Sequence, residues 1–448
     1  MTTPMNSRET MTFSTASFRA LTAAALVAVV GACSSNDILN VDRPDVIDPS
    51  KLGGANGATA LYNGAVGEVA YGQSGTFAGF MLMTSLFTDE FRFGGTPPEV
   101  REMDLEAIKP ENSFAQTIWL SIHRGRRAAE RAAEAMTAIN ATDKRIGELY
   151  ALAGLSTIWI AENYCSGATL SVDQPTVEYG SNLTTDQLFD AALADLNSAS
   201  SHAGGDANNL NLIAVLRARA LLGKGQFAQA AAAVASVPTG FKYDMQYSSA
   251  DARLQNSMKA YIYDYDYTSV SDGEGGSGLN YASAGDPRVP VTQDFGPVSR
   301  FDGRTPMFQF PKYISYGSPI TDASGIEARL IEAEAALQAS NTGTWLSKLN
   351  EARATMAGLA PLTDPGTAAA RVDLMFRERA FWMFGTAHRL GDMRRLVRQY
   401  NRAADSVYPR GAYHKDSLTR GNQVSIRVSI DELNNPNYDN SKCDPTKA

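Results

Sequence analysis

The chain has 448 residues, of which 44% are hydrophobic and 20% are charged, and its formal net charge is −8. This length allows a large core, and the composition is ordinary for a globular protein. The acidic balance, with no basic tail or block, argues against nucleic acid as a partner.

The N-terminal residues have the pattern of a lipoprotein leader. Arg8 and Arg19 precede an apolar run over residues 20–30, which is too short to cross a bilayer as a helix and predicts a removable targeting segment. Two small residues then lead to Cys33, an order that resembles the lipobox of bacterial lipoproteins. The resemblance implies a signal peptide at 1–32 and a lipid on Cys33. The alternative is an ordinary signal peptide with a chance cysteine.

Helical periodicity dominates the chain after a tether and N-terminal segment at 33–57. Helices are expected over 58–71, 79–87, 114–140, 144–163, 210–222 and 227–237, with another opening at Thr184. The helix at 114–140 has one apolar stripe, formed by Ile118, Ile122, Ala129, Ala133 and Met136. The last helix pair, with Phe227 and Pro238 at its ends, resembles a tetratricopeptide repeat. We therefore expect helical hairpins over 58–240.

Residues 241–319 are irregular in pattern and rich in Tyr, Gly, Asp, Ser and Pro. The stretch 261–267 alternates with period two, which predicts a short strand or an extended edge. A loop segment this long in a compact domain is usually functional. Aromatic rings projecting from loops suit stacking on a sugar, so the candidate ligand-binding residues are Tyr263, Tyr265, Tyr267 and Tyr281. Each could instead be a partly buried loop residue.

Helical pattern resumes at 320–400, with helices expected over 326–339, 344–356 and 367–400. Gly385 and Gly391 are candidate bends in the last helix, because glycine lowers helix propensity by about 1 kcal/mol. The tail at 401–448 has turn composition. The sequence therefore predicts a mainly α fold with little β structure.

The cysteines suggest a disulfide that holds this tail. If Cys33 carries lipid, Cys165 and Cys443 remain in an oxidising compartment, where a bond between them would tie the tail to the body of the chain. The alternative is two unpaired thiols.

Motifs for catalysis or metal binding were sought and not found. The four histidines lie far apart in sequence, and no zinc-protease, Cys-x-x-Cys or serine-hydrolase motif occurs. Residues 273–278 satisfy Gly-x-Gly-x-x-Gly but lack the flanking strand and helix of a nucleotide site, so a loop is expected. The acidic residues Asp264, Asp266, Asp272 and Glu274 could hold calcium, but they lack the spacing of an EF-hand loop. We expect no catalytic residue, no metal and no cofactor.

Several motifs resemble the SusD/RagB-like lipoproteins, over nearly the whole mature chain. They include Thr-Asp-Glu-Phe at 88–91, Asp-Pro-Arg at 286–288 and Lys-Tyr at 312–313. The most specific match combines residues 376–380 with 388–395, which are similar to the family's Glu-Arg and Gly-His-Arg-x-x-Asp-Leu-Arg-Arg signature. The chain departs from it by Gly-Thr-Ala at 385–387, where members often carry Glu-Gly. The charged residues Glu378, Arg389, Asp392 and Arg394 are expected to pair across helices in an architectural role.

This resemblance implies a scaffold of tetratricopeptide-like helix pairs, the SusD-like α/α fold, with the irregular segment on the ligand side. It implies that residues 58–448 form a single domain, although a chain of this length would usually suggest two or three. It also implies an outer-membrane lipoprotein at the cell surface. Its partner would be a SusC-like TonB-dependent barrel, to which it delivers an oligomeric nutrient, commonly a glycan, without catalysis. Two alternatives stay open from the residues alone: a lipid-anchored glycoside hydrolase, whose carboxylate pair is a spatial feature, and a helical-repeat scaffold that binds protein.

Overall fold

The computed structural model describes residues 54–448, apart from 76–78, 174–175 and 277. The predicted signal peptide, the lipidation site Cys33 and most of the predicted tether therefore lie outside the described residues. Residues Gly54–Ala448 form one compact unit. Helices dominate it and its strands are short, so the predicted mainly α fold is confirmed. Among these residues, no helix combines the length and apolar character that crossing a membrane requires.

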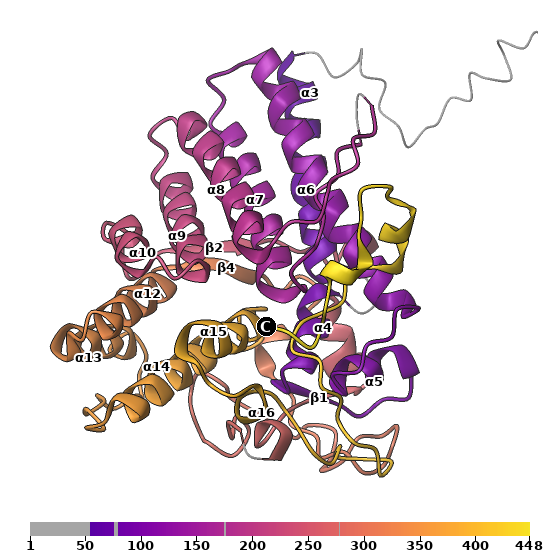
Figure 1. Cartoon of the computed structure of the whole chain (residues 1–448), viewed down its shortest axis with the longest axis vertical. Helices are drawn as coiled ribbons and strands as arrows, with labels where there is room; N and C mark the ends of the chain where they lie inside the picture. The colour runs from indigo at the N-terminus through magenta and orange to yellow at the C-terminus, as the bar shows by residue number, and fades with distance from the viewer. Residues whose placement is uncertain (1–53, 76–78, 174–175, 277) are drawn as a thin grey trace, which may run out of the picture. The chain divides into compact units, whose positions relative to one another are not determined.

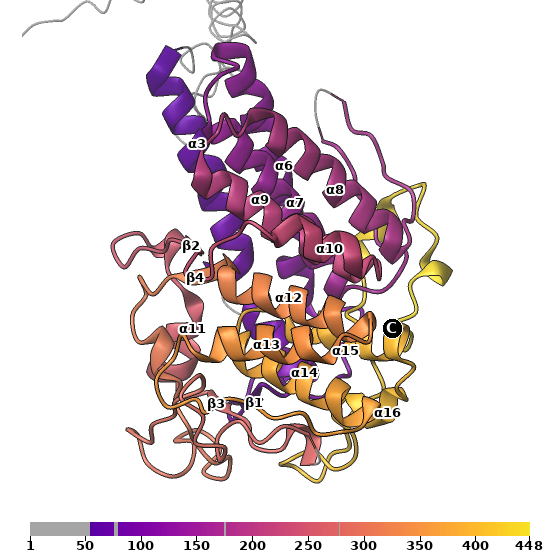
Figure 2. The ribbon, with the colours of Figure 1, turned by 90° about the vertical axis from the view of Figure 1, so that its left-hand side faces the viewer.

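Helices that pack on one another in chain order form the scaffold. They are α3 (Gly54–Ala70), α6 (Ser113–Ile139), α7 (Arg145–Asn163), α8 (Thr185–His202), α9 (Ala207–Gly223), α10 (Phe227–Val234), α12 (Gly325–Gln338) and α13 (Thr342–Arg353). Figures 1 and 2 show these helices ranged side by side from α3 to α13. Helix α14 (Ala368–Trp382) packs on α12, and α15 (Arg389–Tyr400) contacts α7 and the short helix α4 (Phe80–Phe87). The predicted helical hairpins are thus present in both halves of the chain.

Local sequence explains why these helices start and pack where they do. The predicted apolar stripe of α6 is buried at every position, and the Asn112 side chain caps the helix by accepting from the amide of Ala115 at 2.9 Å. Helix α8 begins at a capping box formed by Thr184 and Gln187. Gly223 faces the ring of Phe189, where a Cβ atom would clash, so α8 and α9 approach closely only because this residue is glycine.

Shorter elements join the irregular segment to this scaffold. They are α4 (Phe80–Phe87), α5 (Pro98–Asp104), α11 (Ser257–Lys259), α16 (Ala404–Val407), and the strands β1 (Phe91–Phe93), β2 (Lys242–Met245), β3 (Thr268–Val270) and β4 (Ile320–Ser324). Helix α4 is buried along its whole length. Strand β1 pairs with β3, and β2 pairs with β4, both antiparallel. The irregular segment is therefore fastened near its start, in its middle and just beyond its end.

Two local predictions differ from the structure. The stretch 261–267 is not a strand: Ala260–Asp264 form a π-helical turn, and β3 starts only at Thr268. The reason is that Met258, Tyr261 and Ile262 are buried together, which is a helical spacing that the alternating tyrosines obscure. The single helix predicted over 367–400 is two helices, α14 and α15, because the chain between them adopts the left-handed region at Gly385 (φ 63°).

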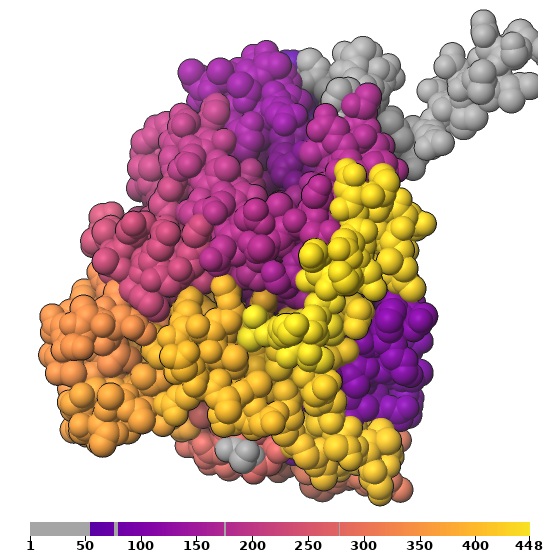
Figure 3. Space-filling view, in the orientation of Figure 1, coloured from indigo at the N-terminus to yellow at the C-terminus, as the bar shows by residue number. Residues whose placement is uncertain are grey.

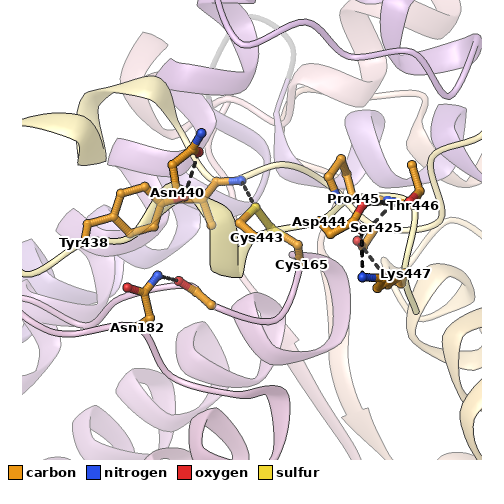
Figure 4. Close-up of a disulfide and its surroundings, with 12 residues drawn as sticks. Cys165, Asn182, Ser425, Tyr438, Asn440, Cys443, Asp444, Pro445, Thr446 and Lys447 are labelled. Carbon is orange, nitrogen blue, oxygen red and sulfur yellow. Dashed lines mark hydrogen bonds and ion pairs between the residues drawn. A yellow bond between two sulfur atoms is a disulfide. The ribbon is translucent and has the colours of Figure 1, made fainter.

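The C-terminal tail crosses back over the helical body (Figure 3). Cys165 and Cys443 form a disulfide, with their Cα atoms 5.2 Å apart and a sequence separation of 278 (Figure 4). The tail also adds backbone hydrogen bonds beside this bond, because the amide of Ile426 donates to Asn163 and the amide of Cys165 donates to Ile426. The tail is thereby held to the end of α7.

Candidate functional site

Five aromatic side chains of the irregular segment form two neighbouring groups. We call them together the aromatic patch: Tyr263, Tyr265, Tyr267, Phe295 and Phe301. Ring centroids lie 5.2 Å apart for Tyr265 and Tyr267 and 4.3 Å for Tyr267 and Phe301, and the second group is the pair Tyr263 and Phe295 at 6.1 Å. Arg300, which precedes Phe301, lies over the Phe295 ring and links the two groups, so three of the four tyrosines proposed from the sequence belong to the patch.

The rings of this patch remain partly open to solvent. Phe301 is 50% exposed and Tyr265 is 36% exposed, whereas the other three members are half-buried. Large aromatic side chains normally bury most of their surface, so two exposed rings that both contact Tyr267 make this patch a candidate binding surface. Such rings offer flat apolar faces on which the C–H face of a sugar can stack.

A buried carboxylate holds the patch in place. Asp266 lies between two of the tyrosines, adopts a left-handed backbone (φ 54°) and is fully buried. Its side chain accepts from the amide of Arg300 at 3.2 Å and from the Gln309 amide group at 3.3 Å. Ser299 donates to the Asp266 carbonyl at 3.2 Å and to Gly94 at 3.0 Å. The reversal at Asp266 places neighbouring tyrosines on one surface and clamps the loop that carries Phe301 beside them.

Polar groups surround the patch. The guanidinium of Arg300 lies 4.5 Å from the ring centroid of Phe295. The Tyr316 hydroxyl donates to Asp264 at 2.6 Å, and this hydrogen bond raises the pKa of Tyr316 to about 12, so the phenol stays protonated at neutral pH. Lys259 pairs with the same carboxylate. Aromatic faces bordered by charged groups can combine stacking with hydrogen bonds to hydroxyl groups.

Tyr281 is not part of this surface. It is fully buried, its ring lies 5.1 Å from that of Phe381 and 4.8 Å from that of Phe384, and its hydroxyl donates to Glu274 at 3.0 Å. This position corrects its choice as a ligand contact, because a sugar cannot reach a ring enclosed on all sides. Its role in the described structure is to pack the irregular segment onto α14.

Phe295 and Phe301 escaped the sequence analysis. Each is an isolated phenylalanine among turn residues, in Asp-Phe-Gly at 294–296 and Arg-Phe-Asp-Gly at 300–303. Glycine and aspartate next to a bulky apolar residue place it at a turn, where burial is difficult. A phenylalanine next to glycine and aspartate in a loop is therefore the sequence pattern that could have identified these two residues, whereas the alternating tyrosines could not.

The four acidic residues considered as a calcium site each interact with a different partner. Asp264 pairs with Lys259, Asp266 contacts Arg300, Asp272 accepts from the amide of Ser283, and Glu274 is held by Arg389. The part of the chain that the structure describes contains no group of three or more His, Cys, Asp or Glu side chains that could hold a metal ion. In the glycine-rich stretch, Gly275 lies against Pro409, and its amide donates to Asp89 at 2.6 Å.

Comparison with solved structures gives consistent matches to one fold. A SusD superfamily protein from Bacteroides vulgatus matches with a TM-score of 0.65 at 15% identity, over 86% of this chain and 99% of that chain. Surface glycan-binding protein A from Bacteroides thetaiotaomicron matches with a TM-score of 0.63 at 14% identity, over 85% and 96%. A SusD-like carbohydrate binding protein from Bacteroides vulgatus gives 0.56 at 16% identity, over 76% and 83%.

No protein-family model matches the sequence, and no curated protein matches it. The likeness therefore concerns architecture, over almost the whole length of the matched structures. It agrees with the resemblance found in the motifs at 88–91, 286–288 and 376–395. The chain has the SusD-like fold, as the sequence motifs predict.

Proposed function

We propose that this chain is a non-catalytic nutrient-binding lipoprotein of the outer membrane, which holds an oligosaccharide on the aromatic patch. The observation that carries the proposal is the exposed pair of rings, Tyr265 and Phe301, on a SusD-like scaffold. Two structural neighbours carry the titles surface glycan-binding protein and carbohydrate binding protein, which supports a sugar as the ligand. Stacking on aromatic rings binds sugars by shape and needs no reactive group.

Delivery to a transporter completes the proposal. A lipid on Cys33 anchors the chain at the cell surface, and a SusC-like TonB-dependent barrel receives the bound oligosaccharide. Lipid attachment is tested by palmitate labelling of the chain and of Cys33→Ser, which should abolish the label. The partnership is tested by a pull-down from detergent-solubilised outer membranes, in which a β-barrel transporter should co-purify. Failure of both would leave a sugar-binding protein without a role in uptake.

The binding site is tested with a panel of oligosaccharides on affinity gels. The protein is the mature chain with Cys33→Ser, and the variants are Phe301→Ala and Tyr265→Ala. Loss of one stacking ring removes about 1.4 kcal/mol, so each variant should bind roughly tenfold more weakly. Tyr179→Ala is the matched control, because this tyrosine is 49% exposed and lies outside the patch. Equal binding by all variants would remove the patch as the site, and release of reducing sugar would favour the hydrolase alternative.

A further inference from the structure

A separate cavity lies next to the scaffold, away from the residues of the aromatic patch. Its volume is about 230 Å³, and it is bounded by the β2–β4 strand pair, the first turn of α12 and the C-terminal end of α14. No member of the aromatic patch lines it. Pockets for drug-sized ligands measure roughly 300–1,000 Å³, so this cavity suits a smaller ligand such as one sugar ring.

Cationic side chains outnumber anionic ones in the wall of this cavity, because Lys242, Lys312 and Arg288 line it together with one carboxylate, that of Glu327. Within the described residues neither lysine forms an ion pair with a carboxylate. Burial lowers the pKa of Lys312 to about 8, although Asp244 acts on it in the opposite sense, so the ammonium group stays largely charged at neutral pH. The Asp244 carboxylate itself accepts from the Thr321 hydroxyl at 2.6 Å. Two lysine charges thus face the cavity without a direct counter-charge, which favours a negatively charged ligand.

The inner end of the cavity adds a polar atom that lacks a partner. The indole N–H of Trp382 has no acceptor among the described residues, and Trp382 lines the cavity. His388, which also lines it, is already partnered: its Nδ1 contacts Thr386 and its Nε2 lies 3.4 Å from the Glu327 carboxylate. A buried donor without an acceptor is costly, so a ligand oxygen that reached the Trp382 indole would be stabilised.

The start of α12 strengthens the preference for an anion. Ser324 caps this 14-residue helix by accepting from the amide of Glu327 at 3.1 Å, and both residues line the cavity. The positive end of the helix dipole therefore points to the same space as the lysines. The pairing of Lys242 with Ser324 across the β2–β4 ladder fixes that lysine beside the helix start.

An apolar surface completes the site. The Trp382 side chain and the methionines Met356 and Met383 line the wall. The guanidinium of Arg288 lies 5.3 Å from the ring centroid of Trp382, and its charge is used by Asp286 at 2.6 Å and Glu378 at 2.7 Å. Arg288 thus orients the indole and does not compete for a ligand. An aromatic side chain and two lysines without an ion pair in the same cavity are complementary to a molecule with one apolar face and one carboxylate.

We propose that this cavity binds a single carboxylated sugar ring, a uronic acid, with its ring on Trp382 and its carboxylate toward Lys242 and Lys312. The site is independent of the aromatic patch and goes beyond the oligosaccharide binding proposed there. It would add recognition of an acidic sugar to a protein whose aromatic patch binds sugars by stacking.

The test is calorimetric titration of the mature Cys33→Ser chain with glucuronate, glucose and acetate. Glucuronate should bind saturably, glucose at least tenfold more weakly, and acetate should not displace glucuronate at equal concentration. Lys312→Gln and Lys242→Gln should each weaken glucuronate binding at least fivefold. Lys447→Gln, which removes an exposed lysine of the tail, is the matched control and should change nothing.

Several results would overturn this proposal. They are equal affinity for glucose, equal competition by acetate, no saturable binding of glucuronate, or unchanged binding in both lysine variants. Phe301→Ala should leave glucuronate binding unaltered, which keeps this test distinct from that of the aromatic patch. A loss of glucuronate binding in Phe301→Ala would place the acid on the patch and refute the cavity as its site.

Discussion

Arg389 holds Glu274 with two hydrogen bonds, of 2.9 and 2.8 Å, and both side chains are buried. Arg389 belongs to the signature stretch 388–395 on α15, and Glu274 belongs to the irregular segment. Tyr281 donates to the same carboxylate at 3.0 Å. The most specific motif of the sequence therefore fastens the irregular segment to the helical scaffold, which is an architectural role.

We expect Arg389→Ala to lower the free energy of unfolding by about 3–5 kcal/mol, because it leaves the buried Glu274 carboxylate without its counter-charge. Urea denaturation monitored by circular dichroism measures this change. Arg371→Ala is the matched control, since it removes an arginine from the exposed pair with Asp364 and should leave the midpoint unchanged. A similar small effect in both variants would contradict the architectural role.

Stability should also depend on pH through Glu90, which lies in the motif at 88–91. Burial raises the pKa of Glu90 from 4.5 to about 8, although the Gly385 amide donates to it at 3.0 Å and Arg389 acts in the opposite sense to burial. The folded state thus prefers protonated Glu90. Its contribution is complete below about pH 4.5 and is lost as the pH rises toward 8, at up to about 1.4 kcal/mol per pH unit.

Glu90→Gln should remove this part of the pH dependence. A glutamine keeps the acceptor for Gly385 and cannot ionise, so the variant should gain stability over the unsubstituted chain as the pH rises from 5 to 8. Urea midpoints at several pH values measure the difference. Asp195 and Asp322, whose pKa values burial raises to about 7, titrate in both proteins and cancel in the comparison. Parallel curves for the two proteins would refute the assignment to Glu90.

The disulfide gives a redox prediction. Cys443→Ser should lower the free energy of unfolding by about 2–5 kcal/mol, because the bond between Cys165 and Cys443 closes a loop of 278 residues and restricts the unfolded chain. Thermal denaturation with and without dithiothreitol measures the effect. The reductant should lower the melting temperature of the unsubstituted chain toward that of the variant and leave the variant itself unaffected. An equal response of both proteins would count against the bond.

Sequence reasoning succeeded where the deciding interactions are local. The apolar stripe of α6 repeats with helical spacing, so its buried face could be predicted from neighbours three and four residues apart. The interruption near Gly385 could be anticipated for the same reason, since glycine favours a left-handed backbone at that point. Gly391, the other candidate bend, lies inside α15, where its missing side chain allows close approach to Glu162.

Sequence reasoning failed where distant residues decide the outcome. The tyrosines at 261–267 alternate in sequence, but burial of Tyr261 and Ile262 converts the stretch into a helical turn. The contact between Tyr267 and Phe301 depends on hydrogen bonds from Ser299 and Arg300 to Asp266, which no local pattern encodes. The interaction partners of the charged residues in the signature stretches 376–380 and 388–395 also depend on distant residues.

Those charges pair as expected in part. Glu378 binds Arg288 and Arg353, and Asp392 binds Arg379 and Arg395. Arg394 behaves differently, because it donates to the carbonyl of Ala161 at 2.9 Å and to the Thr185 hydroxyl at 3.2 Å rather than to a carboxylate. The concentration of charged residues in this stretch of sequence favours a structural role for them. Which residue each charge pairs with is decided by the fold.

The contrast between Tyr281 and Phe301 allows ligand binding to be separated from stability. Tyr281→Phe removes one hydrogen bond to the buried Glu274, so the free energy of unfolding should fall by about 1–3 kcal/mol while oligosaccharide affinity stays the same. Phe301→Ala should weaken oligosaccharide binding and leave the free energy of unfolding nearly the same, because its ring is half exposed. Urea denaturation and affinity gels on the same two preparations measure both quantities. Weaker binding in Tyr281→Phe at unchanged stability would return this tyrosine to the ligand site and contradict the assignment of the site to the aromatic patch.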